Sequence, residues 1–320
     1  MGVCRLIHLI HFDCKIVNAD ASIAFCIKTR FFSMRIIVTG GAGFIGSALI
    51  KHLFAKLDCN ILNIDKLTYA SSAEALTSLE NNPRYTFLKE DICNIAKMKD
   101  AFYSFNPDLV FHLAAESHVD RSIDSPSAFI HSNIVGTYSL LQTALECWEN
   151  SSNTNFRFIH VSTVEVYGSL EINSPAFKEE DPYKPSSPYS ASKASSDLLA
   201  LSWYKTFQFP LIVTHSSNNF GEYQHDEKLI PTIIRNALNN KSIPIYGNGE
   251  NRRDWAYVGE NASALLQIAL KGRLGQIYNI PGMKELSNNQ ITHQICELLD
   301  RFFPLKNHTS YRNQIDYITD

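Results

Sequence analysis

From Arg35 onwards, short β-branched segments alternate with longer segments of helical periodicity. The predicted strands are Ile36–Thr39, Ile61–Ile64, Tyr85–Leu88, Leu109–Leu113, Phe156–Ser162 and Leu211–His215. The predicted helices between them are Ile45–Leu57, Ala73–Leu79, Ile95–Tyr103, Ala128–Trp148 and Tyr189–Phe207. Strands and helices that alternate at this rhythm form right-handed βαβ units around a parallel sheet. The sequence therefore predicts an α/β fold with a doubly wound parallel sheet.

Beyond about Pro182 this alternation loosens, and proline and glycine become frequent. The change predicts a smaller C-terminal lobe that binds substrate over the carboxyl edge of the sheet. We expect residues 34–180 to form a Rossmann-type nucleotide-binding core. Residues 181–320 are expected to complete that core, interleaved with the substrate lobe.

Residues 1–33 precede the first predicted strand, and Met34 stands directly before it. Their apolar segments are interrupted by His8, His11 and Asp13, and they lack the basic start and clean apolar run of a signal peptide. We expect this segment to be a disordered extension or the result of a start codon assigned too early.

The composition argues against several classes of function. The formal net charge of -3 gives no basic surface for nucleic acid, and no apolar stretch approaches the ~18 residues of a membrane span. Seven cysteines are scattered without Cys-x-x-Cys spacing, which predicts neither a disulfide framework nor a metal site. A reducing, cytoplasmic compartment fits this cysteine usage best.

A glycine-rich turn, with Gly40, Gly43 and Gly46, joins the first predicted strand to the first helix. Glycines let the backbone approach a pyrophosphate, and the helix N-terminus presents N–H groups to it. The second strand ends at Asp65, 19 residues after Gly46, where a carboxylate can accept hydrogen bonds from a ribose and would repel a 2′-phosphate. This pattern predicts NAD as the cofactor. The alternative is an ordinary tight turn with a solvated Asp65.

Tyr189 and Lys193 are four residues apart on a predicted helix and therefore share one face. A phenol titrates near ~10, and a neighbouring ammonium favours the phenolate. Tyr189 is therefore a candidate base for a sugar hydroxyl, although the same spacing occurs by chance on many helix surfaces. The glycine-rich turn in the same chain favours the catalytic interpretation.

Thr163 and Glu165 follow the predicted strand Phe156–Ser162 and should emerge at the carboxyl edge of the sheet. Thr163 is placed to hydrogen-bond a substrate hydroxyl, and Glu165 is a candidate base. The residues alone leave open whether both are ordinary strand-end side chains facing water.

From Met34 to Asp320 the chain resembles the dTDP-glucose 4,6-dehydratases of the extended short-chain dehydrogenase/reductase superfamily. The motifs that carry the resemblance are TGGAGFIGS (39–47), DKLTYA (65–70), DI (91–92), HLAAESHVDRSI (112–123), NIVGT (133–137), YSASKASSD (189–197), NNFGEYQHDEKLIP (218–231), PIYG (244–247) and RRDWAYV (252–258). The glycine loop and Tyr-x-x-x-Lys occur across the superfamily, whereas the HVDRSI, EKLIP and RDW blocks are closer to this dehydratase family.

The resemblance implies two sets of binding residues and a homodimer. NAD contacts are implied for Phe44, Ile45, Asp65, Lys66, Leu67, Thr68, Asp91, Ile92, Leu113, Ala114, Ala115, Ser132, Tyr189, Lys193 and Asn219. Contacts to the nucleotide-sugar substrate, dTDP-glucose, are implied for Ser117, Thr163, Glu165, Asn218, Lys228, Leu229, Pro244, Tyr246, Arg253 and Asn288. Lys228 and Arg253 can offset a diphosphate, and arginine suits bidentate phosphate contact. Either can equally be a solvated surface charge.

The implied reaction is an internal oxidation and reduction. Tyr189 takes the proton of the sugar 4-hydroxyl, Glu165 removes the proton at carbon 5, and water leaves from carbon 6 to give a 4-keto-6-deoxy sugar nucleotide.

The sequence departs from the family in two places. The family reads Ser-Thr-Asp-Glu where this chain has Val164, and the family's Asp protonates the departing 6-hydroxyl. The chain also stops at Asp320, where the family continues into a segment that helps to hold the nucleotide, so weaker substrate binding is expected.

These departures leave two alternatives to the dehydratase. One is a related sugar-nucleotide epimerase or decarboxylase, which needs no acid at carbon 6. The other is a non-catalytic protein that binds NAD or a sugar nucleotide.

Overall fold

The computed structural model describes residues 33–171, 174–306 and 309–319. The expectation for residues 1–33 falls outside this part of the chain except at Ser33. The described chain forms two compact units. The larger unit comprises residues 33–217 and 259–280, and the smaller unit comprises residues 218–258 and 281–319. The smaller unit is therefore built from two separate segments of the chain.

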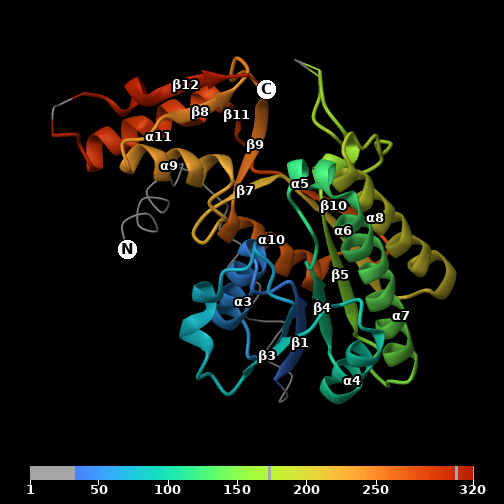
Figure 1. The fold of residues 1–320 in the computed structure, drawn as a ribbon. Helices are drawn as coiled ribbons and strands as arrows, with labels where there is room; N and C mark the ends of the chain where they lie inside the picture. Colours follow the sequence, from blue (N-terminus) through green and yellow to red (C-terminus); the bar gives the residue numbers. More distant parts are fainter. Residues whose placement is uncertain (1–32, 172–173, 307–308, 320) are drawn as a thin grey trace. The chain divides into compact units, whose positions relative to one another are not determined.

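A seven-stranded sheet forms the centre of the larger unit (Figure 1). Its strands are β1 (Met34–Thr39), β2 (Cys59–Asp65), β3 (Tyr85–Lys89), β4 (Leu109–His112), β5 (Arg157–Thr163), β6 (Leu211–Ser216) and β10 (Ile277–Ile280). Their order is β3-β2-β1-β4-β5-β6-β10, and every pairing is parallel. The strand order reverses between β1 and β4, which is where ligands bind in doubly wound sheets. The predicted fold class is confirmed.

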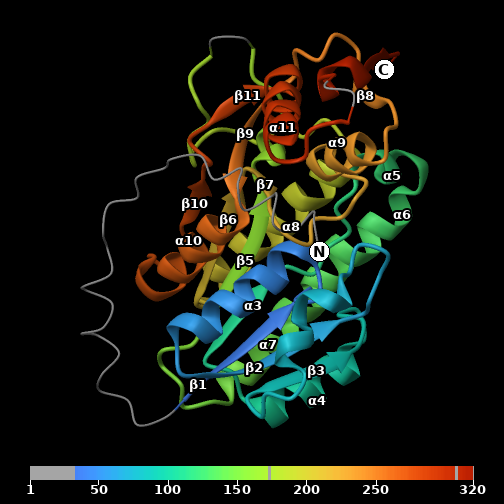
Figure 2. The same ribbon diagram turned by 90° about the vertical axis from the view of Figure 1, so that its left-hand side faces the viewer.

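Helices cover both faces of this sheet (Figures 1 and 2). On one face lie α3 (Phe44–Lys56) and α10 (Val258–Lys271); on the other lie α4 (Ile95–Phe105), α7 (Gly136–Glu149) and α8 (Pro188–Phe207). Leu49 and Leu265 pack on the first face, and Phe102 and Leu141 on the second. Burial on both faces explains why the strands are almost continuously apolar.

The structure refines two predicted helices. The segment Ala73–Leu79 is a 3₁₀ helix, η1, rather than an α-helix. The segment predicted at Ala128–Trp148 changes geometry along its length, from α6 (Pro126–Phe129) through a π-helical turn, η2 (Ile130–Val135), into α7. A short helix that the sequence analysis did not predict, α5 (Val119–Asp124), precedes it.

The smaller unit has two small sheets and two main helices. One sheet joins β7 (Asn218–Phe220), β9 (Arg252–Tyr257) and β11 (Glu285–Ser287); the other joins β8 (Ile243–Tyr246) and β12 (Ile315–Ile318). The helices α9 (Leu229–Leu238) and α11 (Asn288–Phe302) bury Ile233 and Ile295 against these strands, and a 3₁₀ turn, η4 (Tyr311–Gln314), precedes β12.

Among the described residues, no helix combines the length and the apolar character that a membrane span requires.

Candidate active site

The glycine-rich turn between β1 and α3 is shaped by contacts that exclude side chains. Gly40 has φ +71°, and a Cβ on it would lie 2.6 Å from the Ala114 backbone nitrogen. A Cβ on Gly46 would lie 2.3 Å from the Gly40 carbonyl oxygen. Only glycine combines this left-handed φ with such close backbone approach.

The N-terminus of α3 is open in a way that suits a pyrophosphate. Its N-cap residue, Gly43, has no side chain that could cap the helix. A Cβ at this position would meet only the Gly40 oxygen, at 3.2 Å. The first N–H groups of a helix have no partner within the helix, so those of Phe44 and Ile45 can face an anion. The residues present therefore fit a dinucleotide.

The buried Asp65 carboxylate closes the turn from the end of β2. Its Oδ2 accepts a hydrogen bond from the Ala42 N–H at 3.0 Å, and its Oδ1 accepts bonds from the Leu67 N–H at 2.8 Å and the Ser71 hydroxyl at 3.3 Å. Sequence reasoning assigned Asp65 to a ribose. The structure adds that the same carboxylate organises the phosphate turn.

Lys66, which follows β2, links the segment after β3 to the π-helical turn η2. Its Nζ lies 3.1 Å from the Ser132 hydroxyl and 3.5 Å from the Asp91 carboxylate, which follows β3. Burial acts to raise the pKa of Asp91, but the hydrogen bond from the Cys93 N–H and the Lys66 charge outweigh it, so the pKa lies below its ordinary value.

The other predicted cofactor residues of the larger unit lie in the loops that leave the same sheet edge. Leu67 and Thr68 follow β2, Ile92 follows β3, and Leu113, Ala114 and Ala115 follow β4. The Ala114 N–H donates to the Thr39 hydroxyl at 3.3 Å, which ties the β4 loop to the end of β1. Ser117, predicted to contact substrate, is exposed in this β4 loop.

Tyr189 and Lys193 lie on the first turns of α8 and share one face. The helix begins with a capping box in which Ser187 and Ser190 satisfy each other's backbone groups. The side chains of Tyr189 and Lys193 are buried, and the Lys193 ammonium donates to the Val161 carbonyl of β5 at 3.0 Å.

The sequence predicted that the Lys193 ammonium favours the phenolate form of Tyr189, but the pKa of this phenol lies above its ordinary value. Burial raises it, the Glu165 carboxylate raises it further, and a hydrogen bond with Thr163 acts in the opposite direction. The phenol is therefore held neutral in this structure.

Thr163 and Glu165 sit where β5 passes into a 3₁₀ turn, η3 (Val164–Tyr167). The Thr163 hydroxyl accepts the Glu165 N–H at 3.2 Å and caps this turn. The influence of Thr163 and Glu165 on the Tyr189 pKa places all three in one neighbourhood. Val164 packs on the cluster of Val166, Tyr167 and Ala194.

The remaining predicted substrate residues, and Asn219, belong to the smaller unit. Asn218 and Asn219 lie on β7, Lys228 and Leu229 at the start of α9, Pro244 and Tyr246 on β8, Arg253 on β9, and Asn288 at the start of α11. The structure brings Arg253 and Asn288 together, with Arg253 Nη1 2.9 Å from Asn288 Oδ1. Pro244 and Tyr246 lie on the other sheet of the unit.

Sequence reasoning missed a buried polar cluster behind Lys193. Asp197 lies one turn further along α8, and His160, Ser162 and His215 reach it from β5 and β6. The signal was present in the YSASKASSD block, since residues 189, 193 and 197 repeat at helical spacing.

A doubly wound parallel sheet with a glycine turn at β1, an acidic residue ending β2 and a Tyr-x-x-x-Lys pair beside β5 defines a dinucleotide-binding protein of the short-chain dehydrogenase class. The model of the GDP-mannose 4,6 dehydratase family matches residues 37–317, and the chain belongs to that family.

Individual relatives agree with this assignment. The chain is 51% identical over 282 residues to a dTDP-glucose 4,6-dehydratase of Haemophilus influenzae, covering 87% of this chain and 83% of the relative. It resembles the crystal structure of a Bacillus anthracis dTDP-glucose 4,6-dehydratase in complex with NAD, with a TM-score of 0.79, 39% identity and coverage of 90% and 85%. A Streptomyces venezuelae dTDP-glucose 4,6-dehydratase, crystallised with NAD, gives a TM-score of 0.81, 37% identity and the same coverage.

Proposed function

We propose that the protein is an NAD-dependent dTDP-glucose 4,6-dehydratase that forms the 4-keto-6-deoxy sugar nucleotide. One observation carries the proposal: the larger unit places Tyr189, Lys193, Thr163 and Glu165 together at the carboxyl end of β5. The names and bound cofactor of the similar dehydratases support the choice of substrate and of NAD.

The cofactor is held by the β1–α3 turn and by Asp65, with Lys66, Asp91 and Ser132 beside them. When bound, NAD would supply a hydride acceptor, the matching hydride donor once reduced, and a positively charged nicotinamide ring. The Lys193 ammonium is available to fix a ribose hydroxyl.

Tyr189 Oη accepts the proton of the sugar 4-hydroxyl. Its raised pKa means that the free site holds a neutral phenol, so the proton must be lost when cationic charge is brought into the site. Thr163 Oγ1 orients the phenol and the 4-hydroxyl. Glu165 removes the carbon 5 proton once the neighbouring carbonyl has acidified it, and the carboxylate and phenol then act in sequence on adjacent carbons.

The test is incubation with NAD and dTDP-glucose, followed by product analysis for the 4-keto-6-deoxy sugar. Tyr189→Phe should abolish transient absorbance of the reduced cofactor while NAD binding is retained. The role of Tyr189 is wrong if this variant reduces the cofactor at the original rate.

A 4-epimerase is the second candidate, because Val164 supplies no acid for water loss and epimerisation needs none. Recovery of the C4 epimer without a 6-deoxy product would select it. Bound NAD without turnover of any sugar nucleotide would select the non-catalytic alternative.

We further propose that the protein is a homodimer. Helices α7 and α8 pack against each other through Tyr138 and Trp203, whose ring centroids are 6.1 Å apart. Tyr138 on α7, Phe207 on α8 and Val135, which ends η2 just before α7, are each more than 40% exposed. Aromatic side chains of this kind are enriched at the centre of protein interfaces.

A cytoplasmic location is proposed as well. Cys59, Cys93, Cys147 and Cys296, the cysteines in the described part of the chain, are free thiols, as expected in a reducing compartment. A fusion to a fluorescent protein, imaged in the native cell, tests this location.

A further inference from the structure

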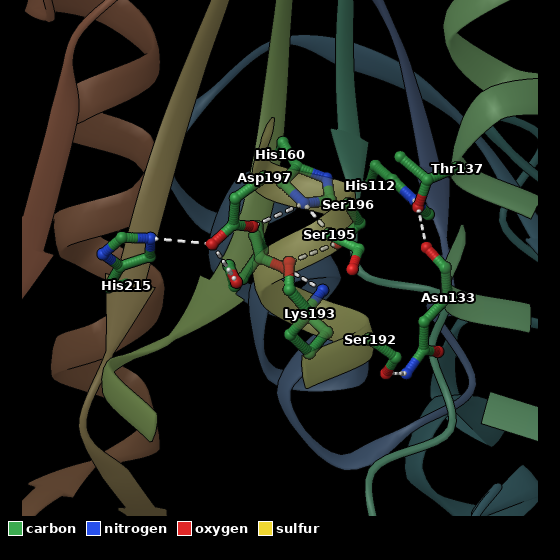
Figure 3. Close-up of polar contacts among 12 residues, drawn as sticks. His112, Asn133, Thr137, His160, Ser192, Lys193, Ser195, Ser196, Asp197 and His215 are labelled. Atoms are coloured by element: carbon green, nitrogen blue, oxygen red, sulfur yellow. Dashed lines mark hydrogen bonds and ion pairs between the residues drawn. The ribbon is translucent and has the colours of Figure 1, made fainter. Parts of the chain in front are cut away.

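Asp197 is a completely buried carboxylate on α8 that receives three hydrogen bonds (Figure 3). His160 Nε2 lies 3.0 Å from its Oδ1, and the Ser162 hydroxyl and His215 Nε2 each lie 3.0 Å from its Oδ2. No reaction step assigned above uses these four residues.

The cluster follows from strand and helix periodicity. His160 and Ser162 alternate on β5, so both face the helix that covers this side of the sheet. Ser162 is paired in register with His215 on β6. Val161 lies between His160 and Ser162 on β5, and its carbonyl accepts a hydrogen bond from the Lys193 ammonium. One short stretch of β5 therefore binds both Lys193 and Asp197.

The charges in the cluster can be assigned. Burial opposes ionisation of Asp197, but the hydrogen bonds from His160 and His215 prevail and hold its pKa well below the ordinary value. Burial lowers the pKa of His160, and its Nδ1 has no hydrogen-bond partner, so this ring is neutral. Asp197 therefore carries a negative charge in the interior.

That charge has one cationic neighbour on its own helix. Lys193 lies one turn before Asp197 and is also buried. Burial lowers the pKa of Lys193, and the Asp197 carboxylate acts in the opposite direction. An ammonium that loses its proton in a buried site can no longer act as a cation beside Tyr189.

Other titratable groups surround Lys193 and Asp197, but none of those described below raises the pKa of Lys193 as Asp197 does. Burial lowers the pKa of His112 of β4, and His160 and Lys193 lower it further; Lys193 and His215 also act to lower the pKa of His160. On the side of β6, the hydroxyls of Tyr167 and Tyr183 lie 2.8 and 3.3 Å from the His215 ring nitrogens. Glu165 interacts with Tyr189. The negative charge of Asp197 acts on Lys193 to raise its pKa.

We propose that Asp197 is a positioning residue for the oxidation step, because its buried negative charge keeps the Lys193 ammonium protonated and thereby maintains the cation beside Tyr189. The part of this inference that concerns catalysis rests on the proposed function. The part that concerns the protonation of Lys193 does not.

The first experiment measures Lys193 directly. Heteronuclear NMR of lysine side chains in the NAD-free protein, with the Lys193 signal assigned from Lys193→Arg, follows its protonation as the pH rises. In Asp197→Asn the ammonium should deprotonate at a lower pH than in the unchanged protein. Identical titrations overturn the proposal. If Asp197→Asn does not fold, the unchanged protein decides: a protonated Lys193 at neutral pH supports the proposal, and a neutral amine overturns it.

The second experiment separates charge from structure through the pH profile of cofactor reduction with dTDP-glucose. Asp197→Asn should move the alkaline limb to lower pH and slow the step there by ~10-fold, part of the ~10²–10⁴ that a positioned general base contributes. Ser162→Ala removes a hydrogen bond to the same carboxylate but leaves the charge of the carboxylate. The alkaline limb of the pH profile should therefore stay at the same pH in this variant. A limb that moves equally in Ser162→Ala contradicts the proposal.

A double variant gives the decisive comparison. Arginine stays protonated at any working pH, so its charge does not depend on Asp197. Adding Asp197→Asn to Lys193→Arg should therefore leave the remaining rate and its pH profile unchanged, whereas an equal loss in both backgrounds would mean that Asp197 acts only through structure. If dTDP-glucose is not turned over but the Lys193 titration shifts, the proposed function fails and the assignment of Asp197 stands.

Discussion

Val164 is the residue at which the candidate site departs from the dehydratase pattern, and it packs in a small apolar cluster. Hydroxide is a poor leaving group, so water loss should be the slow step of the cycle. Val164→Asp should accelerate product formation by roughly 10²-fold, the lower end of what one general acid contributes. The measurement is single-turnover kinetics with dTDP-glucose.

Val164→Asn is the matched control, because asparagine has the size and polarity of aspartate but no proton of suitable acidity. It should not accelerate the reaction. Equal acceleration by both variants, or fast water loss in the unchanged protein, would show that another group or a water molecule supplies the proton.

Asp65 is predicted to select NAD over NADP. Asp65→Ala should weaken NAD binding by about 10–100-fold, the worth of one or two hydrogen bonds to a charged group, and should narrow the preference for NAD. Calorimetric titration with both cofactors measures the two affinities. Asp65→Asn keeps one acceptor for the Ala42 or Leu67 N–H and removes the charge. It should therefore narrow the preference for NAD over NADP, with a smaller loss of NAD affinity than Asp65→Ala. Equal affinity of the unchanged protein for both cofactors would exclude this role.

At the scale of elements, the β1–α3 turn depends on Gly40. Its φ of +71° and the approach to Ala114 at 2.6 Å should make Gly40→Ala costly in both stability and NAD affinity. Gly247 offers a control, since it also has a positive φ, of +58°, but a Cβ there meets nothing within 4 Å. Gly247→Ala should cost only the ~1–2 kcal/mol of the left-handed conformation. Denaturant unfolding compares the two, and an equal cost would contradict the steric argument.

The capping box of α8 is predicted to support catalysis. Ser187→Ala should lower stability by ~1 kcal/mol and loosen the first turn, where Tyr189 lies, so kcat should fall. Ser287 caps α11 with the same motif and offers a matched control. Ser287→Ala should lower stability by a similar amount and leave kcat unchanged, because the first turn of α11 carries Asn288, a predicted substrate contact whose loosening should act on KM. A fall in kcat of the same size in both variants would point to general destabilisation.

At the scale of the molecule, the proposed dimer is tested through two phenylalanines of similar exposure. Phe207 ends α8 and is 42% exposed, and Phe302 ends α11 and is 41% exposed. Phe207→Glu should dissociate the dimer, because a charge would be buried in an interface of ~1,200–2,000 Å². Phe302→Glu should leave it intact. Sedimentation velocity distinguishes these outcomes, and a monomeric unchanged protein would exclude the dimer.

Local signals predicted six of the seven strands of the central sheet, but not β10 (Ile277–Ile280), and they supplied the motifs of the candidate site. Because each strand of a doubly wound sheet is apolar on both faces and each helix on one, Ile36–Thr39 and Tyr189–Phe207 could be recognised from short stretches of sequence. The glycine turn and Tyr-x-x-x-Lys are likewise local, since their function depends on residues a few positions apart. The π-helical turn at Ile130–Val135 was missed because its geometry depends on packing against α8 and not on residue preference.

The sequence by itself determined the fold class, the glycine turn and the placement of Tyr189 and Lys193 on one face of a helix, because each is encoded in periodicity or in a short motif. Only the tertiary structure decided the surroundings that shift the pKa values of Tyr189 and Lys193. Asp197, His160 and His215 come from α8, β5 and β6, and their meeting requires β5 and β6 to pair in register beneath the helix. Burial in the same place raises the pKa of Tyr189, which spacing along a helix cannot reveal. Electrostatic free energy in a protein interior depends on distance and desolvation, and both are properties of the folded chain.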